Sequence, residues 1–163
     1  APDAGGVSDQ WLVSPALQVA GAGNFTFSFQ ERHSFETSGG TFYDGGVIEI
    51  TQNDGASWVD IGASASPGYG GTLFTGASNP LSGRSAYVAA NAAFPNFTTV
   101  NVNLGTAYAG KTVKIRWRIG TDEASHGPGA ALFAPAGVEH GVTNDGPDNA
   151  RLLVMMTPPP EHA

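Results

Sequence analysis

Apolar side chains alternate with polar ones in short runs along most of this chain, and this pattern restricts its fold to β-structure. Phe25, Phe27 and Phe29 alternate with Thr26 and Ser28, which is the period of a half-buried strand. Glycine (23 residues) and proline (11 residues) separate such runs throughout, and helical periodicity is nearly absent. The sequence therefore predicts an all-β protein made of short strands.

Turn signals divide the chain into about ten strands, with NDG at 53–55 and NDGP at 144–147 as the clearest hairpin turns. Many short strands joined by frequent turns are typical of an antiparallel β-sandwich of the jelly-roll type. The Gly-rich stretch 62–83 is expected to be the longest loop. The predicted strands lie near residues 11–19, 25–29, 47–50, 58–61, 84–90, 97–104, 112–119, 130–134, 138–143 and 150–157.

The chain has 163 residues, the length of one ordinary domain, and only 13% of them are charged. Soluble domains usually carry about 25% charged residues. Because aromatic residues make up 10% of the sequence, this low charge does not indicate disorder. A surface rich in serine, threonine, asparagine and glycine suits a secreted or cell-surface protein. The first residues, Ala1-Pro2-Asp3, could be a mature end left by cleavage of a signal peptide.

The net charge of −7 argues against nucleic acid as a partner, because such proteins need a basic face. Lys111, Lys114, Arg116 and Arg118 form the densest basic stretch, but they alternate with apolar residues and indicate the solvated face of a strand. There are no cysteines, which excludes disulfides and Cys-ligated zinc. No stretch approaches the roughly 20 apolar residues of a membrane span, so membrane insertion is not expected.

A series of short motifs runs through residues 11–123: WLVSP at 11–15, FTFSF at 25–29, YDGGV at 43–47, NDGASW at 53–58, NPLSGR at 79–84, YAG at 108–110 and IRWRIGTD at 115–122. In order and spacing this part of the chain resembles the MAM-like jelly-roll module of secreted bacterial metallopeptidases of the immune-inhibitor-A and fungalysin-like types. The resemblance implies an extracellular accessory domain without catalytic activity. The family's Gly-Trp and Asp-Asp strand is absent after Asp122.

The C-terminal part, residues 127–160, resembles a different family. Gly129, Pro135, Gly137, His140 and Asn144 match the second cupin motif, G-x5-P-x-G-x2-H-x3-N, at every position. The resemblance implies that His140 is a possible metal ligand. The partner motif of cupins, H-x-H-x3–4-E, is missing, and a transition-metal site needs several converging nitrogen or oxygen ligands. A bound transition metal is therefore not expected on sequence grounds, and the alternative interpretation of His140 is a solitary strand histidine.

Both families are antiparallel jelly rolls, so we expect one sandwich over residues 1–163 in which the C-terminal hairpin supplies strands that the first module lacks.

MAM-like modules often hold Ca²⁺, and four acidic residues match acidic positions of that pattern. Ca²⁺ binds six to eight oxygens from carboxylates and backbone carbonyls. Alternatively, these carboxylates cap local backbone N–H groups. The candidate Ca²⁺ ligands are Glu36, Asp44, Asp122 and Glu123.

Several large aromatic residues could stack on sugars, although most should be core in a sandwich of this size. Tyr69, in the Gly-rich stretch, is the best exposed candidate for contact with a ligand. No G-x-S-x-G nucleophile motif is present, and the sequence does not indicate an enzyme.

Three functions are compatible with these features. The first is an extracellular binding module without catalytic activity, with carbohydrate, protein or the cell envelope as its ligand and Ca²⁺ as a possible stabilising ion. The second is a self-assembling surface or filament subunit that binds other copies of itself, for which the apolar stretch 152–156 offers an edge strand. The third is a cupin-like metal protein that uses His140.

Overall fold

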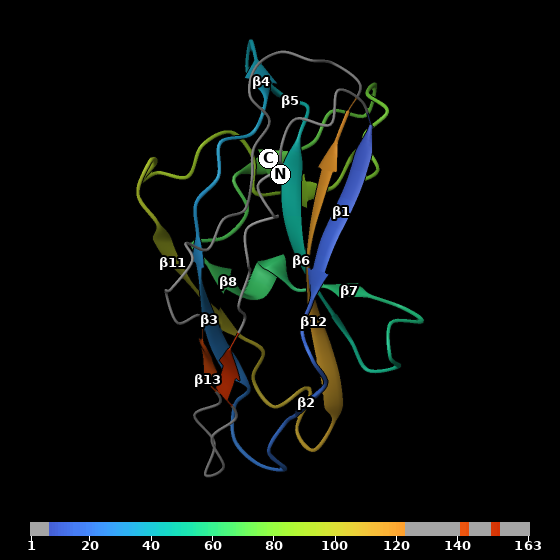
Figure 1. Ribbon diagram of the computed structural model, residues 1–163, viewed down its shortest axis with the longest axis vertical. Coiled ribbons are helices and arrows are strands. Elements are labelled where there is room, and N and C mark those ends of the chain that lie inside the picture. Colours follow the sequence, from blue (N-terminus) through green and yellow to red (C-terminus); the bar gives the residue numbers. More distant parts are fainter. Residues whose placement is uncertain (1–6, 123–140, 144–150, 154–163) are drawn as a thin grey trace, which may run out of the picture.

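The computed structural model describes residues 7–122 and, as backbone only, two further strands at 141–143 and 151–153. The described chain is nearly all β-structure, with strands that pair antiparallel and one short helical turn, η1 (Gly62–Ser64). Two sheets face each other (Figure 1). The all-β sandwich predicted from the sequence is therefore confirmed.

The larger sheet, called the main sheet below, has the strand order β1–β12–β6–β7, and β2 pairs with β12 beyond the end of β1. Its first and last members in the sequence are neighbours, because Ser8 pairs with Thr121 and Val13 with Arg116. The main sheet consists of β1 (Ser8–Val13), β2 (Leu17–Gln18), β6 (Gly45–Thr51), β7 (Val59–Asp60) and β12 (Thr112–Thr121).

The second sheet has the order β3–β11–β8. It consists of β3 (Thr26–Glu31), β11 (Thr98–Asn103) and β8 (Ala65–Ser66). The alternating phenylalanines of β3 behave as the sequence predicts only in part: Phe27 is buried in the core, whereas Phe29 is half-buried and its ring meets that of Trp117 edge-on.

The main core fills the space between the two sheets. Alternate side chains of β6 and β12 enter it from one side, and alternate side chains of β3 and β11 enter it from the other. Burying one large aliphatic or aromatic side chain stabilises a fold by roughly 1.5–3 kcal/mol. The main core includes Phe27, Ile48, Ile50, Val100, Val102, Val113, Ile115 and Trp117.

Strand β6 is buried along its whole length, on both of its faces. Ile48 and Ile50 point into the main core, while Val47 on the opposite face joins a second core. Strands β9 (Gly71–Thr72) and β10 (Ser85–Ala86) pair with each other in the segment that covers this outer face. The second core consists of Val47, Leu73, Leu81, Ala86 and Val88.

The stretch 62–83 therefore has a structural role that its composition does not indicate. It contains only short strands, as predicted, but it is not a loop that extends into solvent. Leu73 and Leu81 bury their side chains almost completely against β6. The backbone of Leu73 also donates a hydrogen bond to Arg84 O (2.9 Å).

Two small hairpins complete the described structure. Strands β4 (Thr37–Ser38) and β5 (Thr41–Phe42) pair at the upper end of the molecule in Figure 1. Strands β13 (Gly141–Thr143) and β14 (Arg151–Leu153) pair with each other, close to β3, and correspond to the hairpin predicted around the NDGP turn. The strand predicted at 130–134 lies outside the described residues.

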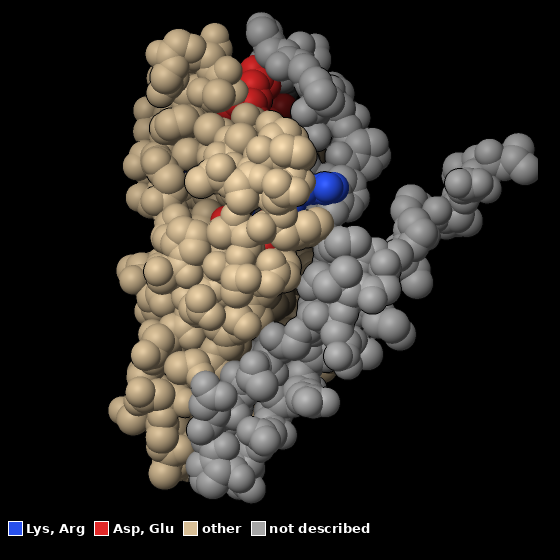
Figure 2. Space-filling view, turned by 90° about the vertical axis from the view of Figure 1, so that its left-hand side faces the viewer, with Lys and Arg blue, Asp and Glu red and all other residues tan. Residues whose placement is uncertain are grey.

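The other predicted strands are found with shifted ends. The stretch 11–19 is divided into β1 and β2, and 84–90 contains only the short β10. The NDG turn between β6 and β7 places Asp54 and Gly55 at φ values of 58° and 94°, the left-handed conformation that such hairpin turns require. On the face shown in Figure 2 the described residues display few charged side chains, as the composition predicts.

Candidate metal centre and its surroundings

The hairpin of β4 and β5 brings the first two candidate ligands together. Glu36 precedes β4, and Asp44 lies between β5 and β6. Next to Asp44, Tyr43 donates a backbone hydrogen bond to Glu36 O (3.3 Å), which continues the hairpin pairing by one residue. Two residues that are eight positions apart in sequence are therefore neighbours at the base of a hairpin.

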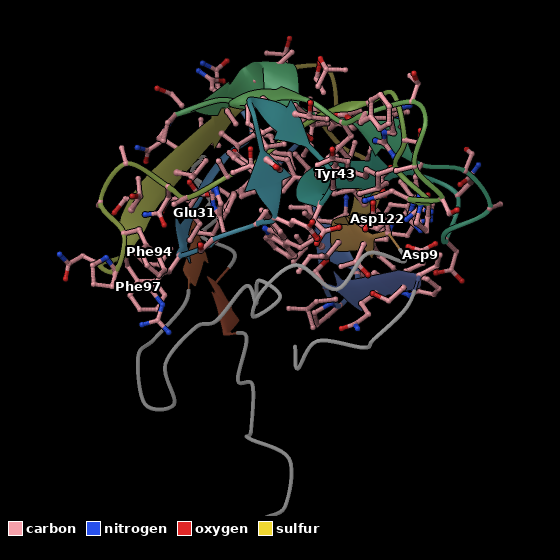
Figure 3. All side chains as sticks on the ribbon, turned by 90° about the horizontal axis from the view of Figure 1, so that it is seen from above. Asp9, Glu31, Tyr43, Phe94, Phe97 and Asp122 are labelled. Carbon is pink, nitrogen blue, oxygen red and sulfur yellow. The ribbon has the colours of Figure 1, made fainter. Side chains whose placement is uncertain are left out.

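Strand pairing in the main sheet adds the third candidate. Gly45 of β6 pairs with Gly120 of β12, so the residues just before β6 and just after β12 lie at the same end of the sheet. The backbone N–H of Asp122 donates a hydrogen bond to Asp44 Oδ1 (3.0 Å). Asp122 and Tyr43 are labelled near each other in Figure 3.

Carboxylate oxygens of Glu36, Asp44 and Asp122 all lie within 4.8 Å of one another. Asp44 and Asp122 are buried (5% and 8% exposed), while Glu36 is half-buried. These are three of the four residues predicted from the sequence as Ca²⁺ ligands; the fourth, Glu123, lies outside the described residues. We call this group the carboxylate triad.

The donor chemistry of the triad suits a hard divalent cation. Its ligand atoms are all oxygens, as Ca²⁺ and Mg²⁺ prefer, with no imidazole or thiolate among them. Two unit negative charges at this separation repel each other by roughly 3 kcal/mol at an effective dielectric constant of about 20. A cation bound between the carboxylates would replace that repulsion with attraction.

Asn79 fixes the backbone on both sides of this end of the sheet. Its carboxamide donates hydrogen bonds to Tyr43 O (2.7 Å) and Gly120 O (2.9 Å), and its Oδ1 accepts one from Leu81 N (2.7 Å). The side chain is buried, at 4% exposed. Sequence reasoning missed this role; the only signal was that Asn79 opens the NPLSGR motif.

Tyr43, the residue before Asp44, forms an aromatic pair with Phe74. Tyr43 is half-buried, and the exposed ring of Phe74 (45% exposed) meets it edge-on at a centroid distance of 5.9 Å. The backbone N–H of Phe74 donates a hydrogen bond to Phe42 O (2.9 Å), so Phe74 lies beside β5, the strand that precedes Asp44.

The expected exposure of Tyr69 is not found, whereas its contact with a ligand stays a prediction. Its ring is half-buried, packs against both cores and meets Tyr87 edge-on at 4.9 Å. Its hydroxyl donates to Asp60 Oδ1 (2.8 Å) and accepts a hydrogen bond from Ile48 N (2.9 Å). Desolvation by burial, opposed in part by the Ile48 hydrogen bond and helped by Asp60, raises the pKa of Tyr69. Gly62 leaves room for the ring, because a Cβ atom at that position would overlap the Tyr69 side chain.

The basic residues of β12 form ion pairs on the outer face of the main sheet. Glu49 of β6 is 3% exposed and accepts hydrogen bonds from Arg84 (2.8 Å) and from Arg116 Nε (2.7 Å). Arg84 also bonds Asp60 (2.7 Å), and the Arg116 guanidinium lies 4.2 Å from the centre of the Trp58 ring. The alternation predicted for β12 is confirmed, but its polar face is paired rather than simply solvated.

One further pair of titratable groups is buried at the end of β3, where Glu31 is the last residue of the strand and His33 follows it. His33 Nδ1 lies 3.5 Å from Glu31 Oε2, and the two side chains are 4% and 3% exposed. Within the described residues neither of these two atoms has a hydrogen-bond partner. The imidazole packs against the rings of Phe35 and Tyr87, at 5.2 Å and 5.8 Å. This pair lies apart from the triad and contributes no ligand to it.

His140, the candidate cupin-type ligand, lies outside the described residues, so its role stays a prediction. Within the part of the chain that the structure describes, no helix is long and apolar enough to cross a bilayer.

No protein-family model matches the chain. No curated protein is significantly similar to it.

Proposed function

We propose that this chain is an extracellular binding module of the jelly-roll type, without catalytic activity, whose ligand-binding end is stabilised by Ca²⁺. One observation carries the proposal: three carboxylates from three separate segments converge within 4.8 Å at one end of the sandwich. A secreted domain meets Ca²⁺ at concentrations that suit weak extracellular sites, with dissociation constants of about 10⁻⁴–10⁻³ M.

Glu36, Asp44 and Asp122 would hold the ion. Bound there, Ca²⁺ would neutralise charge and join the β4–β5 hairpin to the ends of β6 and β12. The chain's own contacts already prepare this arrangement, because Asn79 holds the backbone at Tyr43 and Gly120. The proposal extends the resemblance to MAM-like modules, and the burial of Asp44 and Asp122 favours a stabilising ion over one open to solvent.

The ligand would contact the neighbouring aromatic pair. Phe74 is one of six large apolar side chains that are exposed among the described residues. Its ring also packs on that of Tyr43, the residue before Asp44. An exposed ring can stack on a sugar or pack against apolar side chains of a protein, which are the two ligand classes that we propose.

The ion is tested by thermal unfolding of the purified protein in EDTA and in about 10 mM Ca²⁺. For a dissociation constant of about 0.1 mM, linkage predicts a stabilisation of roughly 2.7 kcal/mol. This corresponds to an increase in Tm of roughly 5–10 °C for a chain of this size. Asp44→Asn should abolish the increase.

Asp54→Asn is the matched control, because Asp54 is an exposed carboxylate in the β6–β7 turn and pairs with Lys114. It should leave the Ca²⁺-induced increase in Tm unchanged. If Ca²⁺ does not shift the Tm of the unmodified protein, the triad is a hydrogen-bonded cap of the sheet and the proposed ion is wrong.

Ligand binding is tested by glycan-array and bacterial-envelope binding in Ca²⁺, with Phe74→Ala as the variant. Phe94→Ala is its control, because Phe94 is equally exposed (49%) and Figure 3 places it far from Tyr43 and Asp122. Loss of binding in Phe74→Ala alone supports the proposed surface. Equal loss in both variants, or in neither, would contradict it.

A further inference from the structure

The buried pair of Glu31 and His33 takes no part in the proposed function. Glu31 Oε2 and His33 Nδ1 lie 3.5 Å apart, and within the described residues neither atom has a hydrogen-bond partner. The two side chains are only 3% and 4% exposed. Because an ionised carboxylate is strongly destabilised away from water unless it is paired, the folded protein must compensate the charge of Glu31.

The separation of the two atoms restricts what can compensate this charge. A water molecule that bridges two atoms at the usual hydrogen-bond distance of about 2.8 Å holds them roughly 4.5 Å apart, which is too far. A tetrahedral metal ion would fit the observed separation but needs four ligands. Among residues 7–122, the carboxylate triad is the one group of three or more histidine or acidic side chains with converging ligand atoms, and this pair is not part of it. A proton needs neither space nor further ligands.

The groups around the pair bring no second counter-charge to Glu31. The ring of Tyr87 lies 5.8 Å from that of His33, and burial raises the pKa of its hydroxyl, which therefore stays neutral. Arg32 lies between the two residues in sequence, but its guanidinium lies over the ring of Phe97, 5.0 Å from the centroid. Other described neighbours have no titratable side chain: Phe35, Asn91, Thr98 and, on the nearby strand β13, Gly141, Val142 and Thr143.

Asn91 connects the pair to a surface turn. The backbone N–H of His33 donates to Asn91 Oδ1 (3.0 Å), and the backbone O of His33 accepts from Asn91 N (3.1 Å). The carboxamide of Asn91 donates to Asn96 O (3.1 Å) and to Thr98 Oγ1 (2.9 Å). These bonds hold the turn between Asn91 and Thr98, which presents the exposed ring of Phe94.

The backbone just before Asn91 is strained. Ala89 has a φ of 52°, a left-handed conformation that is unfavourable for residues other than glycine, and its O accepts a hydrogen bond from Phe35 N (2.6 Å). Such strain persists only where the surroundings hold the backbone in place, and it is common in segments that switch between conformations. Opening the contact between residues 33–35 and 89–91 would relieve it. We call residues 89–98 the Asn91 turn.

We propose that the folded protein holds one proton on the pair of Glu31 and His33, as an imidazolium beside a carboxylate, and that loss of this proton above neutral pH releases the Asn91 turn. In the protonated pair the two buried charges compensate each other. When the proton passes to solvent, a neutral ring faces a buried carboxylate that has lost its one ion-pair partner among the described residues. Opening the turn then gives the carboxylate access to water and relieves the strain at Ala89.

Urea denaturation between about pH 5.5 and pH 8.5 tests the proton. A free histidine is mostly charged below about pH 6.5 and mostly neutral above it, so at higher pH only the folded protein should hold the proton. The stability that this proton contributes is therefore present in full below about pH 6 and is lost as the pH rises. The equilibrium constant for unfolding should increase by up to roughly tenfold per pH unit above about pH 7.

Glu31→Gln removes the buried negative charge and keeps the shape of the side chain. Because this folded variant no longer needs an imidazolium, its unfolding constant should depend only weakly on pH over the same range. Ala89→Gly is the matched control, since it relieves the strained φ of the same region and leaves the pair intact. It should shift the unfolding constant by a similar factor at every pH. The other three histidines are common to all of these proteins, so their titration cancels in the comparison.

Hydrogen exchange tests the release of the Asn91 turn. At about pH 8.5 the backbone amides of Phe35 and Asn91 should be at least roughly tenfold less protected than those of β6, because they become accessible by local opening. Their protection, corrected for the base-catalysed increase in exchange, should fall as the pH rises from about 6. In Glu31→Gln this fall should be absent.

The unmodified protein decides the matter if Glu31→Gln does not fold. Nitrogen-15 NMR at about pH 7.5 should show the ring of His33, assigned through its contacts with Phe35 and Tyr87, as an imidazolium.

A neutral His33 ring at that pH overturns the proposal, as does the same pH dependence of unfolding in the unmodified protein and Glu31→Gln. Amides of Phe35 and Asn91 that exchange only as slowly as those of β6 overturn the release of the turn. None of these measurements involves Ca²⁺, so their outcome is independent of the proposed ion.

Discussion

Arg116 and Glu49 lie directly opposite each other on β12 and β6, and their side chains form an ion pair with Nη2 of the arginine 2.6 Å from Oε2 of the glutamate. The glutamate is almost completely buried, and Arg84 approaches its other oxygen. One buried acid therefore compensates two arginines on the outer face of the main sheet.

Glu49→Ala should lower the free energy of unfolding by roughly 3 kcal/mol, because it leaves two partly buried guanidinium groups without their shared acceptor. Urea denaturation at pH 7 measures the change. Asp54→Ala, which removes an exposed carboxylate that pairs with Lys114, should leave the urea midpoint nearly unchanged. Equal effects of the two substitutions would show that the Glu49 cluster behaves as an ordinary surface ion pair.

Gly120→Ala should destabilise the protein by roughly 2 kcal/mol through overpacking and disturbance of the Asn79 hydrogen bonds. A Cβ atom at this position would lie 2.3 Å from Asn79 Oδ1 and 2.9 Å from Leu81 Cγ, and both of those side chains are buried. Gly21→Ala is the control, since no atom lies within 4 Å of its Cβ position. Urea denaturation of the two variants should therefore give clearly different midpoints.

The pair of Asp9 and Arg118 should make stability depend on pH in acid. The hydrogen bonds from Arg118 hold the pKa of Asp9 below its usual value, so the pair contributes stability above about pH 4, and this is lost as the pH falls through the folded-state pKa. The contribution should be about 1 kcal/mol or less, because both side chains are partly exposed.

Asp9→Asn provides the comparison. The difference in unfolding free energy between the unmodified protein and this variant should be constant from about pH 7 to pH 5 and should shrink below about pH 4. A difference that stays constant throughout the acid range would contradict the assignment.

Tyr69 and Tyr87 should stay protonated in alkaline solution for as long as the protein is folded. Desolvation by burial raises the pKa of both hydroxyls well above that of an exposed tyrosine. A raised pKa in the folded state means that the folded protein favours the neutral hydroxyls. The stability that the two tyrosines contribute is therefore fully present below about pH 10 and is lost as the pH rises further.

Tyrosinate absorbance and circular dichroism, followed together during an alkaline titration, check this. Absorbance from these two residues should appear only together with the loss of native circular dichroism. Ionisation of all four tyrosines in the still-folded protein would refute the burial of the two hydroxyls.

Local patterns in the sequence predict the strands better than they predict the sheets. The alternation around Phe27 and the NDG turn before β7 identify individual elements, because both signals depend on neighbouring residues. The pairing of β1 with β12 joins the two ends of the described sandwich. That contact depends on packing across the whole domain, which short-range periodicity does not encode.

The carboxylate triad likewise combines a local contact, which the sequence can predict, with a contact between distant segments, which it cannot. Glu36 and Asp44 flank a short hairpin, so their proximity follows from local structure once the turn is recognised. Asp122 reaches them only through the register of β12 and β6. Glu36, Asp44 and Asp122, which were grouped by the resemblance to MAM-like modules, do lie together. Tyr69 is less exposed than its Gly-rich surroundings predict, because Leu73 and Leu81 in the same stretch are buried in the second core, against which its ring packs.

Because β6 is buried on both faces, separating only one layer from it does not expose the whole strand to solvent. Separating the two sheets exposes Ile48, and lifting the covering segment exposes Val47, yet both residues belong to one strand. Local fluctuations at the edges can leave this strand intact, but its own amides become accessible only when both layers are lost. The backbone of β6 should therefore exchange hydrogen at the rate of global unfolding, as the last part of the molecule to give way.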